Sequence, residues 1–248
     1  MNPTWFDLHW CYIGLAAAVA LLLVAFGTNV FRQRLDISRW RDPVWLSWLM
    51  VPVYFIHQFE EYGFDATGRT YGFPQTMCAM FGYSLENCPI PASFFPFVNI
   101  PAMWIGAPIA ALLARRNHAV GLAYLGVLAI NAVVHLAPVV AGQGYGPGLL
   151  TAMILFVPLS AWIIHSCFGS PGLRYQTLAA ILLAGVLLHV VLIGSIQLVI
   201  HGALNTSLAN AIQVVNPLWL FVLPWAANKK WPSRVQDSHQ KIVESVDN

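Results

Sequence analysis

Two long stretches without a charged residue most constrain the fold of this chain. No Asp, Glu, Lys or Arg occurs between Asn117 and Leu173, and none occurs between Tyr175 and Asn228. A helix that crosses a membrane needs about 20 mainly apolar residues, so each stretch is long enough for two such helices and a turn. Only 9% of the 248 residues are charged, whereas soluble domains carry about 25%. The sequence therefore excludes an ordinary soluble domain and predicts a polytopic membrane protein.

We expect an all-α fold, a helical membrane bundle with seven transmembrane helices. The expected spans cover residues 8–30, 43–62, 94–114, 119–140, 149–168, 175–201 and 207–227. They form a single transmembrane domain over residues 1–227, and a polar cytoplasmic tail follows over residues 228–248. The loop over residues 63–93 is long for a connection between helices, and long loops often cover functional sites. We therefore regard this external loop as a candidate lid.

Basic residues predict the orientation of the bundle, because cytoplasmic loops collect Lys and Arg. Eleven of the twelve basic residues lie in the tail or in the segments that join spans at one end, and only Arg69 lies at the other end. The residues before the first span carry no Lys or Arg, which favours a retained helix over a cleaved signal peptide. We predict a multi-pass protein of the plasma membrane, or of the inner membrane if bacterial, with its N-terminus outside and its C-terminus cytoplasmic.

The four cysteines differ in the side of the membrane on which we expect them. Cys78 and Cys88 share the loop 63–93, so a disulfide between them is expected if that side is oxidising. A pair of thiolate metal ligands is the alternative, which the lack of a second cysteine pair or a nearby histidine disfavours. Cys11 and Cys167 lie at opposite ends of their spans, so they do not pair with each other.

Polar residues within the expected spans gather at one depth, and such residues usually mark function because they are costly in a bilayer. The second span ends with His57-Gln58-Phe59-Glu60-Glu61, in which His57 and Glu61 are one helical turn apart and share a face. Asn131 and His135 in the fourth span have the same spacing. The third, sixth and seventh spans add Asn99, Gln197, His201, Asn210, Gln213 and Asn216. The sequence thus predicts a polar site in the outer third of the membrane.

The string HQFEE has the H-x-x-E-E form that names the HXXEE family of polytopic membrane proteins, and the chain resembles that family. The Asn-x-x-x-His of the fourth span is also similar to the family's pattern. The resemblance centres on the second to the sixth span. The family has no settled reaction, so the resemblance implies a site rather than its chemistry. The functional residues that it implies are His57, Glu60, Glu61, Asn131 and His135.

A metal-assisted reaction is the first of three chemistries that suit these residues. Histidine and carboxylate ligands at helical spacing suit a divalent metal, either zinc or non-haem iron. The candidate ligands are His57, Glu61, His135 and His201. Glu60 would then be free to act as a general base, with Asn131 as a second catalytic residue. The metal would activate water or polarise a lipid carbonyl, as in hydrolases or oxidoreductases.

The same residues also suit two chemistries without a metal. Two adjacent carboxylates in an apolar setting resist double ionisation, so one could protonate a lipid in an isomerase or cyclase. The residues could instead form the relay of a proton-coupled or ion-coupled transporter, although the chain lacks internal repeats. A purely structural role, with Glu60 and Glu61 solvated at the interface, is the remaining alternative. A formal net charge of +2 provides no basic surface for nucleic acid. We favour an enzyme that acts on a lipid or other apolar small molecule, and we expect membrane lipids to surround it.

Overall fold

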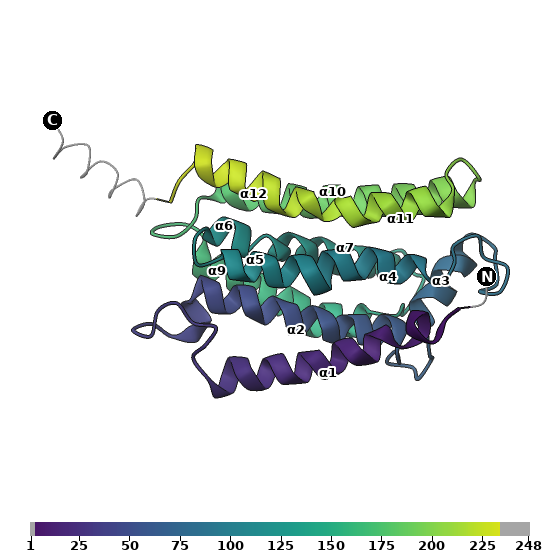
Figure 1. The fold of residues 1–248 in the computed structure, drawn as a ribbon, viewed down its shortest axis with the longest axis horizontal. Coiled ribbons are helices and arrows are strands. Elements are labelled where there is room, and N and C mark those ends of the chain that lie inside the picture. The colour runs from purple at the N-terminus through teal and green to yellow at the C-terminus, as the bar shows by residue number, and fades with distance from the viewer. Residues whose placement is uncertain (1–2, 234–248) are drawn as a thin grey trace.

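The computed structural model describes residues 3–233 and shows an all-α fold in which the long helices run along one common axis (Figure 1). Two π-helical segments, η2 (Ile100–Gly106) and η3 (Ala152–Phe156), and two 3-10 segments, η1 (Arg39–Arg41) and η4 (Asn216–Leu218), join or precede α-helices. The α-helices are α1 (Trp5–Gly27), α2 (Pro43–Tyr62), α3 (Gly72–Met80), α4 (Phe94–Asn99), α5 (Ala107–Leu113), α6 (His118–Gly121), α7 (Tyr124–Val140), α8 (Leu149–Thr151), α9 (Val157–Cys167), α10 (Tyr175–Ile200), α11 (Thr206–Val215) and α12 (Trp219–Lys230).

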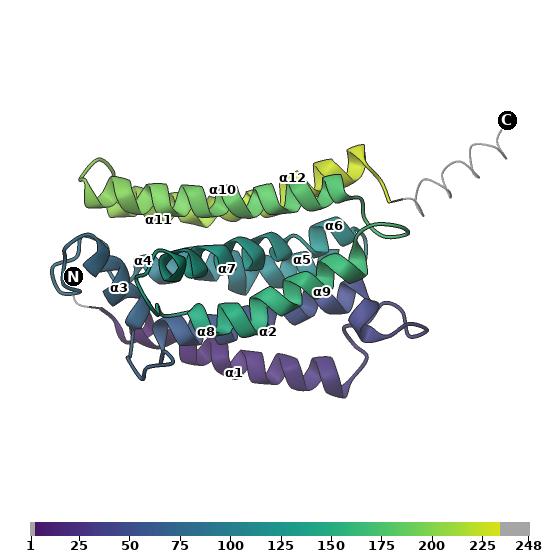
Figure 2. The ribbon, with the colours of Figure 1, turned by 180° about the vertical axis from the view of Figure 1, so that it is seen from behind.

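The helices form three layers, which Figure 1 and Figure 2 show from opposite sides. The outer layers consist of α10, α11 and α12 on one side and of α1, α2, α8 and α9 on the other. Between them lie α4, α5, α6 and α7. We call the end of the bundle that carries α3 the α3 end, and the opposite end the α6 end.

Six helical segments of residues 3–233 are long and apolar enough to cross a membrane. The chain is therefore a multi-span helical membrane protein. These segments correspond to six of the seven expected spans, and their bounds are Trp5–Gly27, Phe94–Leu113, His118–Val140, Leu149–Cys167, Tyr175–Ile200 and Thr206–Lys230. Helix α12 continues beyond residue 228, where we expected the polar tail to begin, and residues 234–248 of that tail lie outside the described part.

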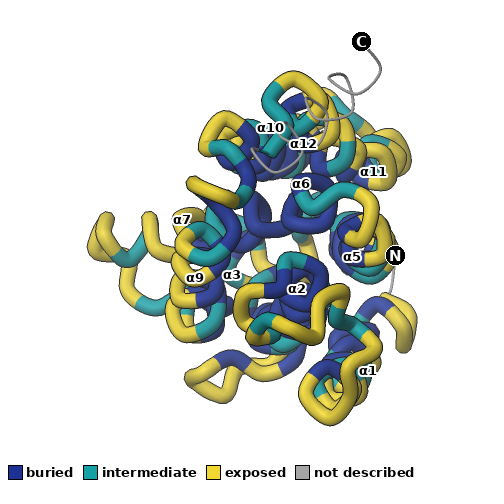
Figure 3. The backbone as a smooth tube through the Cα atoms, turned by 90° about the vertical axis from the view of Figure 1, so that its left-hand side faces the viewer, coloured by how far each residue is buried: buried dark blue, intermediate teal, exposed yellow. Residues whose placement is uncertain are grey.

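The remaining expected span is α2, a helix of 20 residues that is too polar to be counted with the other six. It is nevertheless the most enclosed helix of its layer, and most of its side chains are buried (Figure 3). It contacts α1, α5, α6, α7, α8 and α9. Because protein rather than lipid surrounds it, α2 can carry His57, Glu60 and Glu61 in its final turns.

A buried carboxylate fixes the start of α2. Asp42 is 1% exposed, and its Oδ1 accepts hydrogen bonds from the backbone N–H groups of Val44 and Trp45. Its Oδ2 accepts from the N–H groups of Gln33 and Arg34, at 2.8 and 3.1 Å, in the segment between α1 and α2. Asp42 thus caps the helix at its N-terminus and ties the preceding segment to it. This cap fixes where α2 begins, and therefore where its site residues lie.

The loop 63–93 is folded over the α3 end of the bundle. Cys78 and Cys88 form a disulfide, so the expected pairing is confirmed. Asp65 accepts hydrogen bonds from Thr67 and Arg69, and the Arg69 guanidinium lies 2.8 Å from its carboxylate. Burial raises the pKa of Asp65, but these hydrogen bonds outweigh burial and hold that pKa below its usual value. The loop is therefore held both by a covalent bond and by a local charge pair.

Two glycines let α7 and α10 touch along their backbones. A Cβ atom on Gly185 would lie 2.3 Å from the carbonyl oxygen of Gly126, and one on Gly126 would lie 2.1 Å from the carbonyl oxygen of Ile181. Close backbone approach at small residues is a common way to join helices in membranes. This crossing sets the distance between the middle layer and the layer of α10, and thus the space left between them towards the α3 end.

We expect Gly185→Ala to lower the free energy of unfolding by about 1–3 kcal/mol, because the added methyl group would meet a backbone atom that does not rotate away. Thermal unfolding of the purified protein in detergent measures the effect. Gly194→Ala is the matched control on the same helix, since a Cβ atom there meets nothing within 4 Å. Equal stability of the two variants would contradict the assigned crossing.

Candidate metal site

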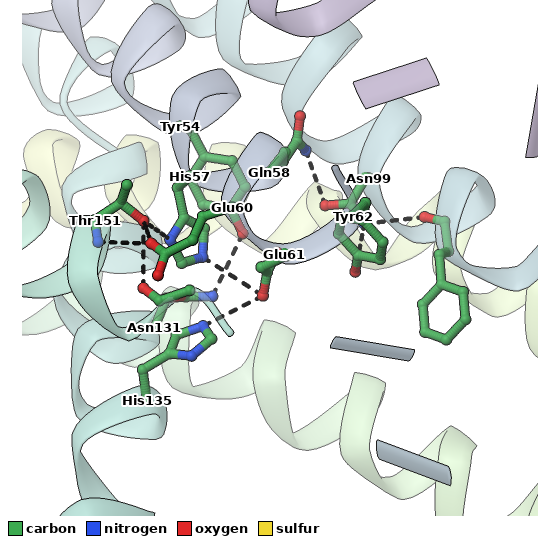
Figure 4. Close-up of polar contacts among 12 residues, drawn as sticks. Tyr54, His57, Gln58, Glu60, Glu61, Tyr62, Asn99, Asn131, His135 and Thr151 are labelled. Carbon is green, nitrogen blue, oxygen red and sulfur yellow. Dashed lines mark hydrogen bonds and ion pairs between the residues drawn. The ribbon is translucent and has the colours of Figure 1, made fainter. Parts of the chain in front are cut away.

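Three of the residues expected to ligate a metal lie together inside the bundle. His57 and Glu61 are one turn apart on α2, and His135 is near the end of α7 (Figure 4). The Oε1 atom of Glu61 lies 3.5 Å from His57 Nε2 and 3.3 Å from His135 Nε2. One ligand atom from each residue lies within 4.8 Å of the others, and all three residues are buried. The residues that the sequence predicted on two different helices therefore meet in one cluster.

The distances in this cluster suit a metal ion. Histidine nitrogen and carboxylate oxygen atoms bind zinc at about 2.0–2.2 Å, so two ligands at a tetrahedral angle are roughly 3.3 Å apart. The two measured distances to Glu61 Oε1 are close to that value. Two histidines and one carboxylate also form the ligand set of many non-haem iron sites. The cluster could thus hold either metal with little movement.

Thr151, which was not predicted from the sequence, holds His57 on the Nδ1 side of its ring. The Nδ1 atom of His57 lies 2.8 Å from the hydroxyl oxygen of Thr151, which itself donates a short hydrogen bond to Glu60 Oε2. A hydroxyl group has one proton to donate, and Glu60 takes it. The threonine oxygen must therefore accept from His57, which places the ring proton on Nδ1 and leaves Nε2 with its lone pair.

The lone pair of His57 Nε2 has no hydrogen-bond partner among the residues that the structure describes, although the atom is fully buried. It faces Glu61 Oε1, which is also an acceptor when ionised. Two acceptors facing each other in an apolar interior are unfavourable unless a cation or an added proton lies between them. The cluster is thus chemically incomplete in a way that a positive charge would satisfy.

Glu60 faces away from this cluster and caps another helix. Its Oε1 accepts from the Tyr145 hydroxyl at 2.6 Å and from the N–H of Leu150 at 3.1 Å. Its Oε2 accepts from the N–H of Thr151 at 2.7 Å as well as from the Thr151 hydroxyl. These N–H groups begin the helix that α8, η3 and α9 form together, where a carboxylate is stabilised by the free donors of the first turn. Both oxygens of Glu60 are therefore occupied, and its geometry is that of a positioning residue.

Gly148 leaves the space in which the two histidines meet. Its φ of +91° lies in the left-handed region, and a Cβ atom would lie 2.5 Å from His135 Cε1 and 2.9 Å from His57 Cε1. The ring of Phe156 covers His57 from another side, with the ring centroids 4.4 Å apart. Neither Gly148 nor Thr151 was predicted from the sequence as part of the site. The available signal was a threonine in the first turn of an apolar span, at the level of the other polar residues.

The structure places the other two predicted site residues differently from the cluster. Asn131 is one turn from His135 on α7, and its Nδ2 lies 3.5 Å from the Tyr54 hydroxyl. Its Oδ1 is buried and has no partner within residues 3–233. His201 follows the last residue of α10 and is exposed, so the structure does not bring it to the cluster. Gln58 and Asn99 form a separate network, in which Trp104 donates to Gln58 and Asn99 donates towards Tyr62.

A cavity of about 350 Å³ lies beside the cluster. Its walls come from α2, α4 and α7 on one side and from α10 and α11 on the other, and α3 covers it at the α3 end. Most of the lining is apolar, but Glu61, Asn131 and His135 reach it. His57 does not line it, so the cavity meets the cluster on the side of Glu61 and His135. Pockets of this kind, apolar with a few placed polar groups, are typical of small-molecule sites.

The fold and the site define a multi-span helical membrane protein with a buried His/Glu/His group that could hold a metal ion. Residues 48–163 match the family described as "Protein of unknown function with HXXEE motif", which confirms the resemblance over this region. The match extends from within α2 to within α9, and therefore includes all three residues of the cluster as well as Thr151. No curated protein and no solved structure matches the chain.

We expect Thr151→Val to be more harmful than Thr151→Ser, because valine keeps the volume but leaves His57 Nδ1 without a partner and removes one of the two hydrogen bonds to Glu60 Oε2. The loss of a buried hydrogen-bond partner costs about 1–3 kcal/mol of stability. Thermal unfolding of both variants in one detergent measures this difference. If serine and valine prove equally stable at this position, the hydroxyl does not bridge the two side chains.

Proposed function

We propose that the protein is a membrane enzyme in which His57, Glu61 and His135 hold a divalent metal next to an apolar cavity. The observation that carries the proposal is that the buried Nε2 atom of His57 has no hydrogen-bond partner within residues 3–233 and lies 3.5 Å from Glu61 Oε1. Zinc and iron both suit the ligand set, and the chemistry would be of the hydrolase or oxidoreductase type. The metal would activate water or polarise a carbonyl group of the substrate.

Three protein ligands leave a metal with at least one open position, which is the arrangement of catalytic rather than structural zinc sites. Here that position would face the cavity, because Glu61 and His135 line it whereas His57 does not. The substrate would accordingly be a lipid or another apolar small molecule that enters from the surrounding membrane lipids. Apolar walls would exclude bulk water from the reacting atoms.

The remaining site residues would act on the substrate or on the ligands. Asn131 Oδ1 is a free buried acceptor beside the cavity, so Asn131 would bind a donor group of the substrate near the metal. Glu60 and Thr151 would hold His57 in the tautomer that ligates through Nε2. Helix α3 would act as a lid, since it covers one end of the cavity and the Cys78–Cys88 disulfide restrains it.

We also propose that α2 is a seventh membrane span and that the α3 end lies outside. Helix α2 is 20 residues long, which is enough to cross the hydrocarbon core. Disulfides persist in oxidising compartments, and the Cys78–Cys88 bond lies at the α3 end. Most basic residues lie at the α6 end or after α12, which suits a cytoplasmic location. The N-terminus would then be outside, and the segment after α12 would be cytoplasmic.

Metal analysis of the purified protein tests the proposed function. Protein that has never met a chelator is expected to hold about one equivalent of zinc or iron. His57→Ala and His135→Ala should each lower the affinity for that metal at least about tenfold, and Thr151→Val should lower it by a similar factor through loss of positioning. His201→Ala is the matched control, because it removes an exposed histidine and should retain the metal.

Each outcome of the metal analysis decides between named alternatives. Loss of metal in His201→Ala with retention in His135→Ala would overturn the ligand set. Wild-type protein without stoichiometric metal, even after incubation with excess zinc or ferrous iron, would overturn the metal proposal. The cluster would then carry a proton between His57 and Glu61, as a metal-free lipid isomerase or a proton carrier requires. Proton flux in liposomes that Glu61→Gln abolishes would favour the carrier.

Impermeant maleimide labelling tests the proposed orientation. We expect a cysteine at Ala141→Cys to be labelled in intact cells, and one at Arg116→Cys to be labelled only after permeabilisation, since these exposed positions lie at opposite ends of the bundle. The background should be low, because Cys11 and Cys167 are buried and the other two cysteines are paired. The reverse labelling pattern would place the α3 end in the cytoplasm.

A further inference from the structure

The wall of the cavity opposite the His/Glu/His cluster carries polar groups of its own. Helix α10 contributes His189, which is 7% exposed, and η4 contributes Asn216, which is 5% exposed. Both residues line the cavity. A polar side chain in the middle of an apolar span is costly, so its free hydrogen-bonding atoms indicate which ligand would compensate for them.

His189 presents an acceptor. Its Nδ1 lies 2.8 Å from the carbonyl oxygen of Gly185, one turn back on α10. A carbonyl oxygen only accepts hydrogen bonds, so Nδ1 carries the proton of the neutral ring and Nε2 has the lone pair. Within residues 3–233 the structure shows no hydrogen bond to that Nε2 atom. The ring therefore needs nothing further from its own helix and still offers one acceptor.

Asn216 lies on the same wall of the cavity. Its Nδ2 donates to the carbonyl oxygen of Leu188 at 2.9 Å and to Gln213 Oε1 at 3.1 Å. Because the Leu188 oxygen can only accept, this bond identifies which end of the amide is nitrogen. Asn216 Oδ1 is buried and lacks a partner in the described part of the chain. Gln213 is held in turn by its 3.0 Å bond to the Ser195 hydroxyl, so the amide is fixed in place.

His189 lies near the level of the metal-ligating cluster. The crossing of Gly126 with Gly185 provides a common reference, and α7 and α10 run in the same direction from it (Figure 1). His189 is four residues beyond the crossing on α10, and His135 is nine residues beyond it on α7. At 1.5 Å per residue, His135 lies roughly 7 Å nearer the α3 end. The two polar centres thus face one cavity from different helices and at neighbouring depths.

We infer that His189 Nε2 accepts a hydrogen bond from the hydroxyl group of an apolar substrate, in a subsite that Asn216 also lines. An acceptor without a donor calls for a hydrogen-bond donor, and a neutral hydroxyl costs less to bring into an apolar cavity than a charged ammonium group. This inference rests on the proposed function only in taking the cavity as the substrate site. It adds the substrate class, a small apolar alcohol whose hydroxyl is held on the α10 wall while the rest of the molecule lies against Glu61 and His135.

The test compares two probes that differ in one donor, farnesol and farnesyl methyl ether. Both are apolar and of a size that suits a small binding pocket, but only the alcohol donates a hydrogen bond. We expect the purified full-length protein in lipid nanodiscs to bind radiolabelled farnesol about five- to tenfold more tightly than the ether, as one net hydrogen bond predicts. Competition by the unlabelled ether measures the ratio of the two affinities.

Variants of the subsite locate the hydrogen bond. His189→Phe removes the acceptor, keeps an aromatic ring and breaks only a bond within α10, so it should reduce the preference for the alcohol to about twofold or less. His189→Gln retains an acceptor and should restore part of the preference. A ratio between two ligands of one variant remains meaningful even if that variant is less stable.

The two sets of variants separate this inference from the proposed function. Glu61→Gln should lose the metal but keep the preference for the alcohol, because the subsite lies on other helices. Stoichiometric metal without any preference between the probes would overturn the subsite alone. A preference for the alcohol in protein that binds no metal would overturn the metal site alone. A preference that survives in His189→Phe would place the alcohol elsewhere and also overturn the subsite.

Discussion

The structure depends on the cost of placing a carboxylate inside an apolar bundle. Glu60 and Glu61 are adjacent in sequence and both are buried, yet they are stabilised by different groups. Glu60 is surrounded by four donors that come from the start of α8 and the loop before it. Glu61 is surrounded by two histidines. This difference makes Glu60 an anchor that joins two helices, and leaves Glu61 between two histidines in a group that could hold a metal ion.

The sequence predicted the part of the site that helical periodicity determines. His57 and Glu61, and likewise Asn131 and His135, are one turn apart, so the residue spacing alone indicates that two polar faces meet. The Thr151 bridge could not be predicted in this way, because it depends on a contact between residues more than 90 positions apart in the chain. His201 was included by its depth alone, but the end of α10 carries it to an exposed position.

The number of spans depends on a related difference between lipid-facing and protein-facing helices. Apolar length identifies helices that face lipid, and six helical segments of residues 3–233 satisfy it. Helix α2 faces protein on most sides, so it can be polar enough to fail that criterion and still have sufficient length to cross a bilayer. The least apolar of the expected spans is thus the one that carries the site. In a small membrane protein, a weak span signal can therefore indicate the helix that bears the functional residues.

The chain from Glu60 through Thr151 to His57 has the same geometry whether the missing positive charge is a metal or a proton. With a metal, the Nδ1 proton bound to Thr151 leaves Nε2 free to ligate, which is what buried carboxylate and hydroxyl partners do for ligating histidines elsewhere. With a proton, the same bond would support an imidazolium ring between Thr151 and Glu61. An imidazolium needs only one carboxylate beside it, however, whereas the cluster brings a second imidazole, from His135, within 3.3 Å of the same oxygen. Two imidazoles converging on one carboxylate oxygen are better explained by a shared ion than by a shared proton.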